Sequence, residues 1–449
     1  MDNTDFAVLV GRLERESDRR PKVHSSKVAL VAAAGYAPLA LFALLLLAAC
    51  GFAIASLLSG QPPGVFTIVA AVVALAGLGG TIRALWIEPQ PPAGKDLLRE
   101  DAPALFAAID ELVQKMATSR KGRTHIAGID WVTLDREFNL SIQQCALRGV
   151  FGDYSNHLRV GVPLLMALSI AEFKTILAHE IGHLGAVHNR FSAWIYRQRD
   201  TWMTLLQRFE EPDTIFERML APFYRRYIPY FHAYTFLLAR NHEYAADRAA
   251  VRATNARVLA RALIKIELIG RFLAEVFWKR LFDQVEKVPE PQYLPYSVMP
   301  RALTVAQKEW QRPDWLHSAL RRYAGDADAH PPLGERLAAL DVEAELPKQV
   351  SEKSALALLG DVDAVLRQCD AEWSAEYVPA WRKRHNVIRE AHWKIAQYDN
   401  TPTQDLKPEQ LWEKSQLLLD VAREHEAIET LQALVALNAK AAQAQFLLG

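Results

Sequence analysis

The stretch that decides the fold is Leu177-Ala178-His179-Glu180-Ile181-Gly182-His183-Leu184, with two histidines four residues apart and a glutamate after the first. Residues four apart share one face of an α-helix, so His179 and His183 can direct ring nitrogens at one metal ion. Glu180 lies about a third of a turn from His179, where it can hold a water molecule beside the ion. Such a water has a lowered pKa, and a carboxylate can take its proton during attack on a carbonyl. The pattern predicts half of a zinc site with metallopeptidase chemistry.

The surroundings of this stretch favour a buried helix. Residues 169–172, Ser-Ile-Ala-Glu, have the pattern of a capping box at a helix N-terminus. Apolar residues follow at helical spacing: Phe173, Ile176, Leu177, Ile181 and Leu184. Two imidazoles and a carboxylate inside such a helix would be costly without partners. A shared metal ion is the simplest partner for them.

A zinc hydrolase site usually has a third protein ligand. The metzincin pattern would place Gly three residues and His six residues after the second histidine. Those positions hold Ala186 and Asn189, so the metzincin class is excluded. His188 lies roughly 140° around the helix from His183 and is interpreted as a surface or second-layer residue.

A second predicted helix, residues 241–250, is the better source of the third ligand. It carries Glu243 and Asp247 one turn apart, and its four alanines would let it pack close to the first helix. Glu243 would bind the ion, and Asp247 would accept the free N–H of a ligating histidine. The alternatives are an exposed acidic face paired with neighbouring arginines, and His242 as a rival donor.

Together these two motifs resemble the membrane-bound gluzincin metallopeptidases that include the HtpX heat-shock protease and the CAAX prenyl endopeptidases. Two further stretches agree. Phe138-Asn139 resembles the family's Asn-containing strand, with Leu140 in place of the usual small residue. Residues 330–336, His-Pro-Pro-Leu-Gly-Glu-Arg, resemble the family's His-Pro-Pro-x-x-x-Arg motif. The resemblance covers roughly residues 95 to 340.

The resemblance implies a role for each residue of the two zinc motifs. It implies His179, His183 and Glu243 as the ligands of one Zn²⁺ ion per chain. Glu180 would act as the general base of catalysis. Asp247 would support a ligating histidine from behind.

Two residues of the third motif also receive roles from the resemblance. His330 would be a catalytic residue that stabilises the developing oxyanion, a role that needs a donor about 3 Å from that oxygen. A helix-entry residue fixed by two prolines is the alternative for His330. Arg336 would pair with an acid on one of the metal helices, or it would be an ordinary surface cation.

Two uncharged segments precede the predicted catalytic region. Residues 28–58 and 64–82 are each long enough to cross about 30 Å of hydrocarbon. The short uncharged turn 59–63 joins them, so the sequence predicts a membrane hairpin. The alternative is a buried core hairpin of a soluble protein.

The flanking charges predict the orientation of this hairpin. Six cations precede the first segment, Arg83 and Lys95 follow the second, and the turn has none. Cationic flanks stay in the cytosol. We therefore expect a two-span protein of the cell membrane with its catalytic domain on the cytoplasmic side. Only three cysteines are present, which does not suggest a disulfide framework.

The predicted fold class is α+β, mainly α. The predicted domains are a cytosolic segment (1–27), a transmembrane hairpin (28–87), a zincin-type catalytic domain (88–345) and a helical accessory region (346–449). Inside the catalytic domain we expect an amphipathic helix over 101–116 and short strands near 127–133, 141–150 and 157–162, with a turn at 152–153. An open edge of this sheet would let an extended substrate add itself as a strand.

Two regions keep alternative interpretations. The interval 191–240 mixes aromatic residues and arginines, which suits a membrane-interface surface or a lid, but equally a packed helical layer. Residues 427–438 and 444–449 resemble part of a tetratricopeptide repeat. A lone repeat cannot bury its own face, so earlier helices would complete it or it would pack on the catalytic domain. This region is a candidate site for a protein partner.

The combined expectation is a membrane-anchored zinc-dependent endopeptidase that hydrolyses peptide bonds with a zinc-bound water. Its partners would be a protein or peptide substrate and the lipid membrane. The formal charge is zero and there is no basic cluster, so a nucleic-acid partner is not expected. Membrane-protein quality control and precursor processing fit equally well. The alternatives are a catalytically silent membrane scaffold or chaperone that recruits partners through its C-terminal helices, and a zinc hydrolase acting on non-peptide bonds.

Overall fold

The computed structural model describes residues 3–60, 62–86, 94–118, 128–146, 154–185, 195, 198–199, 202, 205–322, 331–347, 353–438 and 441–448. The chain forms two compact units. Unit 1 comprises residues 1–269 and 307–360, and unit 2 comprises residues 270–306 and 361–449. The predicted domain boundaries at residues 27, 87 and 345 stay a prediction.

Four helices begin the chain: α1 (Asn3–Arg19), α2 (Pro21–Ala34), α3 (Ala37–Leu58) and α4 (Val65–Ala84). The uncharged run 28–58, expected as one span, is divided by a break at Gly35 and Tyr36. Pro38 explains the break, because a proline has no N–H to donate to the carbonyl four residues earlier. The first candidate span therefore begins at Ala37 and not at Val28.

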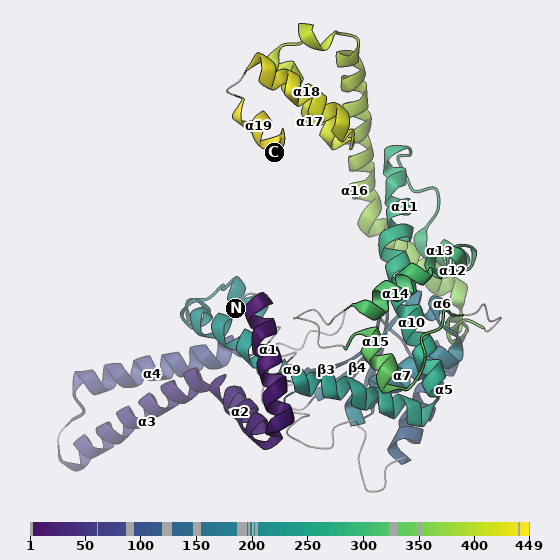
Figure 1. The fold of residues 1–449 in the computed structure, drawn as a ribbon. Helices are drawn as coiled ribbons and strands as arrows, with labels where there is room; N and C mark the ends of the chain where they lie inside the picture. Colours follow the sequence, from purple (N-terminus) through teal and green to yellow (C-terminus); the bar gives the residue numbers. More distant parts are fainter. Residues whose placement is uncertain are drawn as a thin grey trace. The chain divides into compact units, whose positions relative to one another are not determined.

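Helices α3 and α4 form the predicted hairpin and run side by side (Figure 1). Both are long and apolar enough to cross a membrane, and little of either is buried inside the protein. Phe42 lies so close to Gly77 that a Cβ there would be 2.3 Å from its ring. The two candidate transmembrane helices thus meet through a large side chain on one and a missing side chain on the other.

A small mixed sheet precedes the metal motif. Its strands are β1 (Lys95–Asp96), β2 (Trp131–Asp135), β3 (Leu140–Ala146) and β4 (Tyr154–Gly161). The order is β1-β2-β4-β3, with β2 parallel to β4 and the other pairs antiparallel. The three expected strands are confirmed with shifted bounds, whereas β1 was not expected. The turn expected at 152–153 lies outside the described residues.

The helices of unit 1 that accompany this sheet are α5 (Pro103–Thr118), α6 (Val162–Ala167), α7 (Ile170–Gly185), α9 (Ile215–Ala253), α10 (Ala256–Phe272), α13 (Gln307–Trp310), α14 (Pro313–Arg321), α15 (Leu333–Ala339) and the 3₁₀ turn η3 (Ala355–Leu358). Helix α5 confirms the amphipathic helix expected over 101–116. Together with the sheet, these helices confirm an α+β fold that is mainly helical.

Helix α9 is continuous over 39 residues although it contains Pro222 and Pro229. It begins with a capping box between Thr214 and Glu217. Its first half buries an aromatic cluster against α2, formed by Trp202, Tyr224, Tyr227, Ile228 and Phe231 with Val28 and Ala32. In this part of the interval 191–240 the described residues therefore form a packed helical layer.

Gly35, at the break between α2 and α3, packs directly against this aromatic cluster. Its carbonyl accepts a hydrogen bond from the Tyr224 hydroxyl at 3.0 Å. A Cβ at Gly35 would lie 2.6 Å from the hydroxyl of Tyr227 and 2.7 Å from Trp202. The joint between α2 and α3 is consequently held on α9 by close contacts that only glycine permits.

Unit 2 is helical, as expected for the C-terminal region. It contains η1 (Leu273–Phe277), α11 (Trp278–Phe282), η2 (Asp283–Glu286), α12 (Pro295–Val305), α16 (Val362–Asp399), η4 (Thr403–Asp405), α17 (Pro408–Asp420), α18 (Glu424–Leu437) and α19 (Ala442–Leu448). Helix α16 contributes Ile388, Ala391 and Ile395 to a core with α17 and α18. Earlier helices thus supply the partners that the repeat-like segment needs (Figure 1).

Candidate metal centre

The predicted capping box starts helix α7. The backbone N–H of Ser169 donates to the Glu172 carboxylate at 2.8 Å, and the N–H of Glu172 donates to the Ser169 hydroxyl at 3.3 Å. Arg261 and Lys265 of α10 reach the same fully buried carboxylate, at 2.7 and 2.8 Å. The start of the metal-motif helix is therefore fixed both locally and by another helix.

Helices α7 and α9 approach each other closely at the metal motif. A Cβ at Gly182 would lie 3.1 Å from the Cα of Ala246 and 3.3 Å from the Cβ of Ala249. Small residues on both sides permit this approach, as the alanines of the second motif predicted. Because the helices are so close, the side chains of His179 and His183 on α7 and of Glu243 on α9 can reach a common point.

Three nitrogen and oxygen donors converge at that point. The Nε2 atoms of His179 and His183 are 3.2 Å apart. The Glu243 carboxylate lies 3.5 Å from Nε2 of His179 and 3.4 Å from Nε2 of His183. His179 and Glu243 are buried, and the His183 side chain is 9% exposed.

These separations can be compared with the size of a zinc site. Tetrahedral ligands lie about 1.6 bond lengths apart, so zinc bonds of about 2.0–2.2 Å place their donors about 3.3–3.6 Å from one another. The observed spacings of 3.2, 3.4 and 3.5 Å agree with this value. Two imidazoles and a carboxylate are also a donor set that zinc accepts. The residues present therefore fit a zinc ion.

Asp247 lies behind the first histidine. Its Oδ1 is 2.9 Å from Nδ1 of His179, so Nδ1 donates its hydrogen to Asp247 and Nε2 is directed toward the other donors. Arg336 of α15 donates to the same carboxylate through Nε at 2.9 Å and Nη2 at 2.5 Å. The expected acidic partner of Arg336 is thus Asp247, and the surface-cation alternative is excluded by its burial.

The contact between His179 and Asp247 shifts their pKa values in opposite directions. Burial alone would lower the pKa of His179, but the Asp247 and Glu243 carboxylates outweigh it and raise that pKa to about 9. Burial would raise the pKa of Asp247, but His179 and Arg336 lower it to about 2. Asp247 therefore stays ionised at physiological pH and can accept the hydrogen of His179 Nδ1.

Glu180 lies beside the donor group, and the potential ligand atoms of His179, Glu180 and His183 all fall within 4.8 Å of one another. Its Oε2 accepts a hydrogen bond from the backbone N–H of Ile142 at 3.3 Å. Ile142 belongs to β3, the terminal strand of the sheet. The carboxylate thus lies between the metal donors and a sheet edge, which is the position a proton acceptor for a bound peptide would need.

The remaining histidine candidates have different outcomes. His242 is buried and its ring stacks on that of His183, with centroids 6.5 Å apart. Among the described residues, the group whose donor spacing could hold a metal is His179, Glu180 and His183, and it includes neither His242 nor Glu243. Glu243 lies beside that group, within 3.5 Å of both Nε2 atoms. His188 and His330 lie outside the described residues, so the oxyanion role of His330 stays a prediction.

The sequence did not reveal two contacts of this site. Nothing in the pattern around Ile142 indicates that its N–H would meet Glu180, because 38 residues separate them. Arg240 and Tyr244 of α9 both bind Glu335 of α15, across 95 and 91 residues of sequence. Helical spacing was the one available signal, since 240, 244 and 247 fall on one face of α9.

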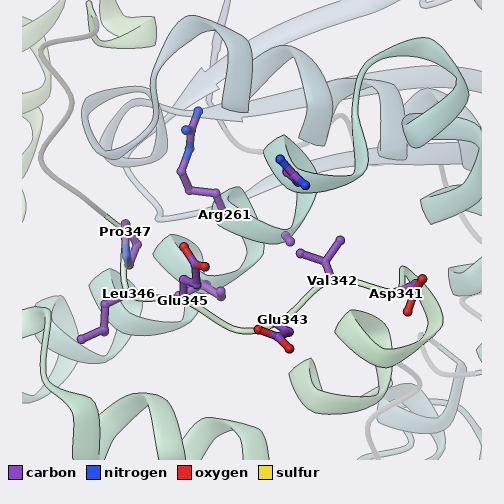
Figure 2. Close-up of a pocket in the computed structure, with 10 residues that line it drawn as sticks. Arg261, Asp341, Val342, Glu343, Glu345, Leu346 and Pro347 are labelled. Carbon is purple, nitrogen blue, oxygen red and sulfur yellow. The ribbon is translucent and has the colours of Figure 1, made fainter.

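A separate pocket of about 580 Å³ lies between α10 and residues 341–347. Figure 2 shows its lining, in which the Arg261 side chain points away from the segment that carries Asp341, Glu343 and Glu345. None of the metal-site residues lines it. Arg261 is also engaged by Glu172, so this pocket borders the anchor of α7 rather than the metal donors.

A comparison with protein-family models adds independent information. Residues 152–344 match the model of peptidase family M48. Over these residues the chain is similar to peptidase family M48. This is the family of the HtpX and CAAX prenyl protease metallopeptidases, as the two zinc motifs had predicted. The match includes both metal-motif helices and Arg336.

The match to family M48 supports a metallopeptidase, a class of enzyme whose substrates are proteins or peptides. The match ends before unit 2 resumes at residue 361, so the M48 region and the α16–α19 helices are distinct parts of the chain. In the other two comparisons, no curated protein and no solved structure matches the chain.

Proposed function

We propose that this chain is a membrane-anchored, zinc-dependent endopeptidase. The observation that carries the proposal is the convergence of His179, His183 and Glu243 at spacings of 3.2–3.5 Å, which suit one tetrahedral ion. These three residues would hold Zn²⁺, and Asp247 would orient His179. The match of residues 152–344 to family M48 supports the same chemistry.

The reaction divides between the ion and the protein. A bound zinc ion would polarise the scissile carbonyl and lower the pKa of the attacking water. Glu180 would accept the proton of that water at its carboxylate and later pass it to the leaving amine. We assign Glu180 to the base and Glu243 to the metal because Glu243 lies within 3.5 Å of both Nε2 atoms, whereas Glu180 is held by the Ile142 amide.

Strand β3 is the proposed docking edge for substrate. Among the described strands it pairs with β4 alone. The carbonyl of Asn139 accepts the N–H of Gly161, and the N–H of Ile142 points the opposite way, toward Glu180. Backbone polar groups alternate sides along a strand. The backbone groups of Leu140 and Gln144 and the carbonyl of Ile142 would therefore be presented to an extended peptide lying beside the metal donors.

The hairpin α3–α4 is the proposed membrane anchor. Its two helices have mean hydropathies of 2.6 and 2.3. Six cations precede α3, Arg83 lies in the last turn of α4, and Lys95 follows that helix. By the distribution of these charges, the catalytic domain would face the cytosol. A peptidase held there would act on membrane proteins in quality control or on a membrane-bound precursor.

The substitution Glu180→Gln tests the mechanism. It keeps the shape of the side chain and removes its ability to accept a proton. We expect purified Glu180→Gln to retain one zinc per chain while its peptidase activity falls by about 10²–10⁴. Metal content and cleavage of a fluorogenic peptide library would be measured on the full chain in detergent, with Glu100→Gln on an exposed glutamate as the matched control.

Two results would count against the proposal. Full activity of Glu180→Gln would remove Glu180 from the mechanism. A wild-type protein that binds no zinc would contradict the proposed metal site.

Comparing the proteomes of cells that express wild type or Glu180→Gln would then reveal which membrane proteins or precursors are cut.

A further inference from the structure

Helix α9 carries a second set of polar contacts close to the metal donors. Arg240 lies one turn before Glu243, and its side chain is only 18% exposed. Its Nη1 binds the Glu14 carboxylate of α1 at 3.2 Å, and its Nη2 binds the Glu335 carboxylate of α15. Tyr244 donates to the same Glu335 oxygen at 2.9 Å. One guanidinium thus joins three helices.

Helix α1 is packed beside this arginine by apolar contacts. Phe6, Leu9 and Val10 of α1 contact Ala233 and Phe236 of α9. The Phe6 and Phe236 rings meet edge to face at 6.1 Å. The Arg240 guanidinium lies 5.8 Å from the centre of the Phe236 ring. The N-terminal helix is therefore docked on α9 by a small apolar cluster and by an ion pair at its edge.

The residue after Glu335 is the one that holds Asp247. Neighbouring residues of α15 thus bind α9 at two places, Glu335 at Arg240 and Tyr244, and Arg336 at Asp247. Because α15 is only seven residues long, movement at Glu335 would also displace Arg336. The Asp247 carboxylate fixes the Nδ1–H of His179, so its position sets where the ring directs Nε2.

We propose that Arg240 is a positioning residue for the metal centre, held by Glu14 of the N-terminal helix α1 and acting through Glu335, Arg336 and Asp247 on His179. This inference rests on the proposed zinc site. Arg240 suits the role because its separate nitrogens bind two carboxylates at once, which the single ammonium group of a lysine cannot reproduce in a fixed geometry. Helix α1 thereby becomes part of the catalytic unit although it precedes the membrane hairpin.

The experiment measures zinc affinity of the full chain in detergent by competition with a fluorescent chelator, using Zn²⁺ itself as the probe. We expect Arg240→Gln to weaken zinc binding about three- to tenfold, less than the 10–100-fold typical of a residue that touches a ligand directly. Arg240→Lys should lie between wild type and Arg240→Gln. Glu14→Gln should act in the same direction with a smaller effect, because Glu335 still holds the arginine.

The matched control is Arg248→Gln, which removes an exposed arginine eight residues further along α9. It should leave zinc affinity unchanged. On a cleavable peptide, Arg240→Gln should lower kcat and leave KM close to wild type, because substrate contacts are untouched. If Arg240 had only a structural role, Arg240→Gln would lower the melting temperature but would not lower kcat selectively while KM stays unchanged.

A coupling test uses Arg336→Lys as background. If Arg240 acts through Arg336, then Arg240→Gln should have little further effect on zinc affinity in that background. Equal affinities for Arg240→Gln and Arg248→Gln would overturn the inference while the zinc site stands. If Arg240→Gln does not fold, the zinc affinity of Glu335→Gln tests the inference instead. The Glu335 side chain is 44% exposed, so we expect its substitution to leave the fold intact. An unchanged affinity in Glu335→Gln would equally overturn it.

Discussion

Asp247 shows how one buried side chain organises the metal centre. It binds His179 on one side and Arg336 on the other, and its side chain is only 3% exposed. A buried carboxylate is costly unless its charge is compensated. Arg336 supplies that compensation through two hydrogen bonds, which leaves Asp247 ionised and able to hold the histidine N–H.

The substitution Asp247→Asn tests this arrangement. An amide nitrogen cannot accept the hydrogen bonds of both partners, so the His179 ring would lose its fixed orientation. We expect zinc affinity to fall about 10–100-fold, with a parallel loss of activity. Chelator competition on the purified protein would measure the affinity.

Asp110→Asn is the control for Asp247→Asn. It removes a carboxylate that also pairs with an arginine, Arg99, but is 56% exposed. We expect no change in zinc affinity for it. Equal affinities of Asp247→Asn and wild type would show that His179 does not need its carboxylate partner.

At this scale the sequence was informative where spacing along one helix decides the geometry. His179, His183, Glu243 and Asp247 were all predicted in this way, and the structure brings their side chains together. The arginines that neighbour Glu243 and Asp247, of which Arg240 is one, were considered only as partners for these acids. Its actual partners come from α1 and α15, and no local pattern can indicate pairing across 226 and 95 residues.

Among the elements, α7 has a start that is fixed both by its own cap and by another helix. Glu172 caps its own helix and binds two cations of α10, Arg261 and Lys265. Burial alone would raise the pKa of Glu172, but Lys265, the Ser169 amide and Arg261 together hold that pKa below its ordinary value of 4.5. The ionised form is therefore the stabilising one.

We expect Glu172→Gln to destabilise the protein at neutral pH. The two cations are 31% and 17% exposed, so we reduce the usual penalty for breaking a buried pair to about 1–3 kcal/mol. Because the folded pKa is lowered, the stabilisation is complete above the unfolded value of 4.5 and is lost as pH falls through the folded pKa. The free energy of unfolding, followed by tryptophan fluorescence in urea, should differ from wild type at pH 7 and converge with it in acid.

Glu111→Gln is the comparison for Glu172→Gln. Glu111 also pairs with a lysine, Lys174, at 2.7 Å, but its side chain is 56% exposed. Exposed pairs contribute little, so this variant should unfold close to wild type. A difference between Glu172→Gln and wild type that persists unchanged into acid would contradict the assigned role of the carboxylate.

Elements were predictable where local signals agree and less so where packing decides. The Ser169–Glu172 box marked the start of α7 correctly. Pro38 was the available signal for the break between α2 and α3, but the uncharged composition of residues 28–58 concealed it. The two-residue strand β1 is specified by its pairing with Leu134 and Thr133, which lies beyond any local pattern.

For the whole molecule, the orientation of the hairpin decides where proteolysis occurs. The cation distribution predicts that the turn near Ser59 faces outward and that both ends of the chain lie in the cytosol. A single cysteine can report this, in a Cys50→Ser background that removes the exposed thiol of α3. Cys145 and Cys369 are buried.

We expect a membrane-impermeant maleimide to label Ser59→Cys in intact cells. Asp405→Cys, at an exposed position of unit 2, should be labelled only after the membrane is opened. Labelling of Asp405→Cys in intact cells, with protection of Ser59→Cys, would reverse the proposed topology. It would leave the metal site unaffected.

The two prolines inside helix α9 affect where this helix can bend. Pro222 and Pro229 each lack the N–H that a helix interior requires, so the carbonyls of Arg218 and Arg225 lose their partners within the helix. Both prolines lie in the half that packs against the hairpin side, and the half that holds Glu243 has none. Bending should therefore concentrate in the first half.

Such a helix would act as a flexible coupling between the lipid and the reaction centre. Thickness fluctuations of the bilayer that tilt α3 and α4 would be taken up around residues 218–229, before they disturb the donors. The double substitution Pro222→Ala with Pro229→Ala should slow amide hydrogen exchange over residues 216–229 and leave residues 240–250 as they were. Stiffening the helix in this way would transmit the motion of the membrane directly to the carboxylate of Glu243.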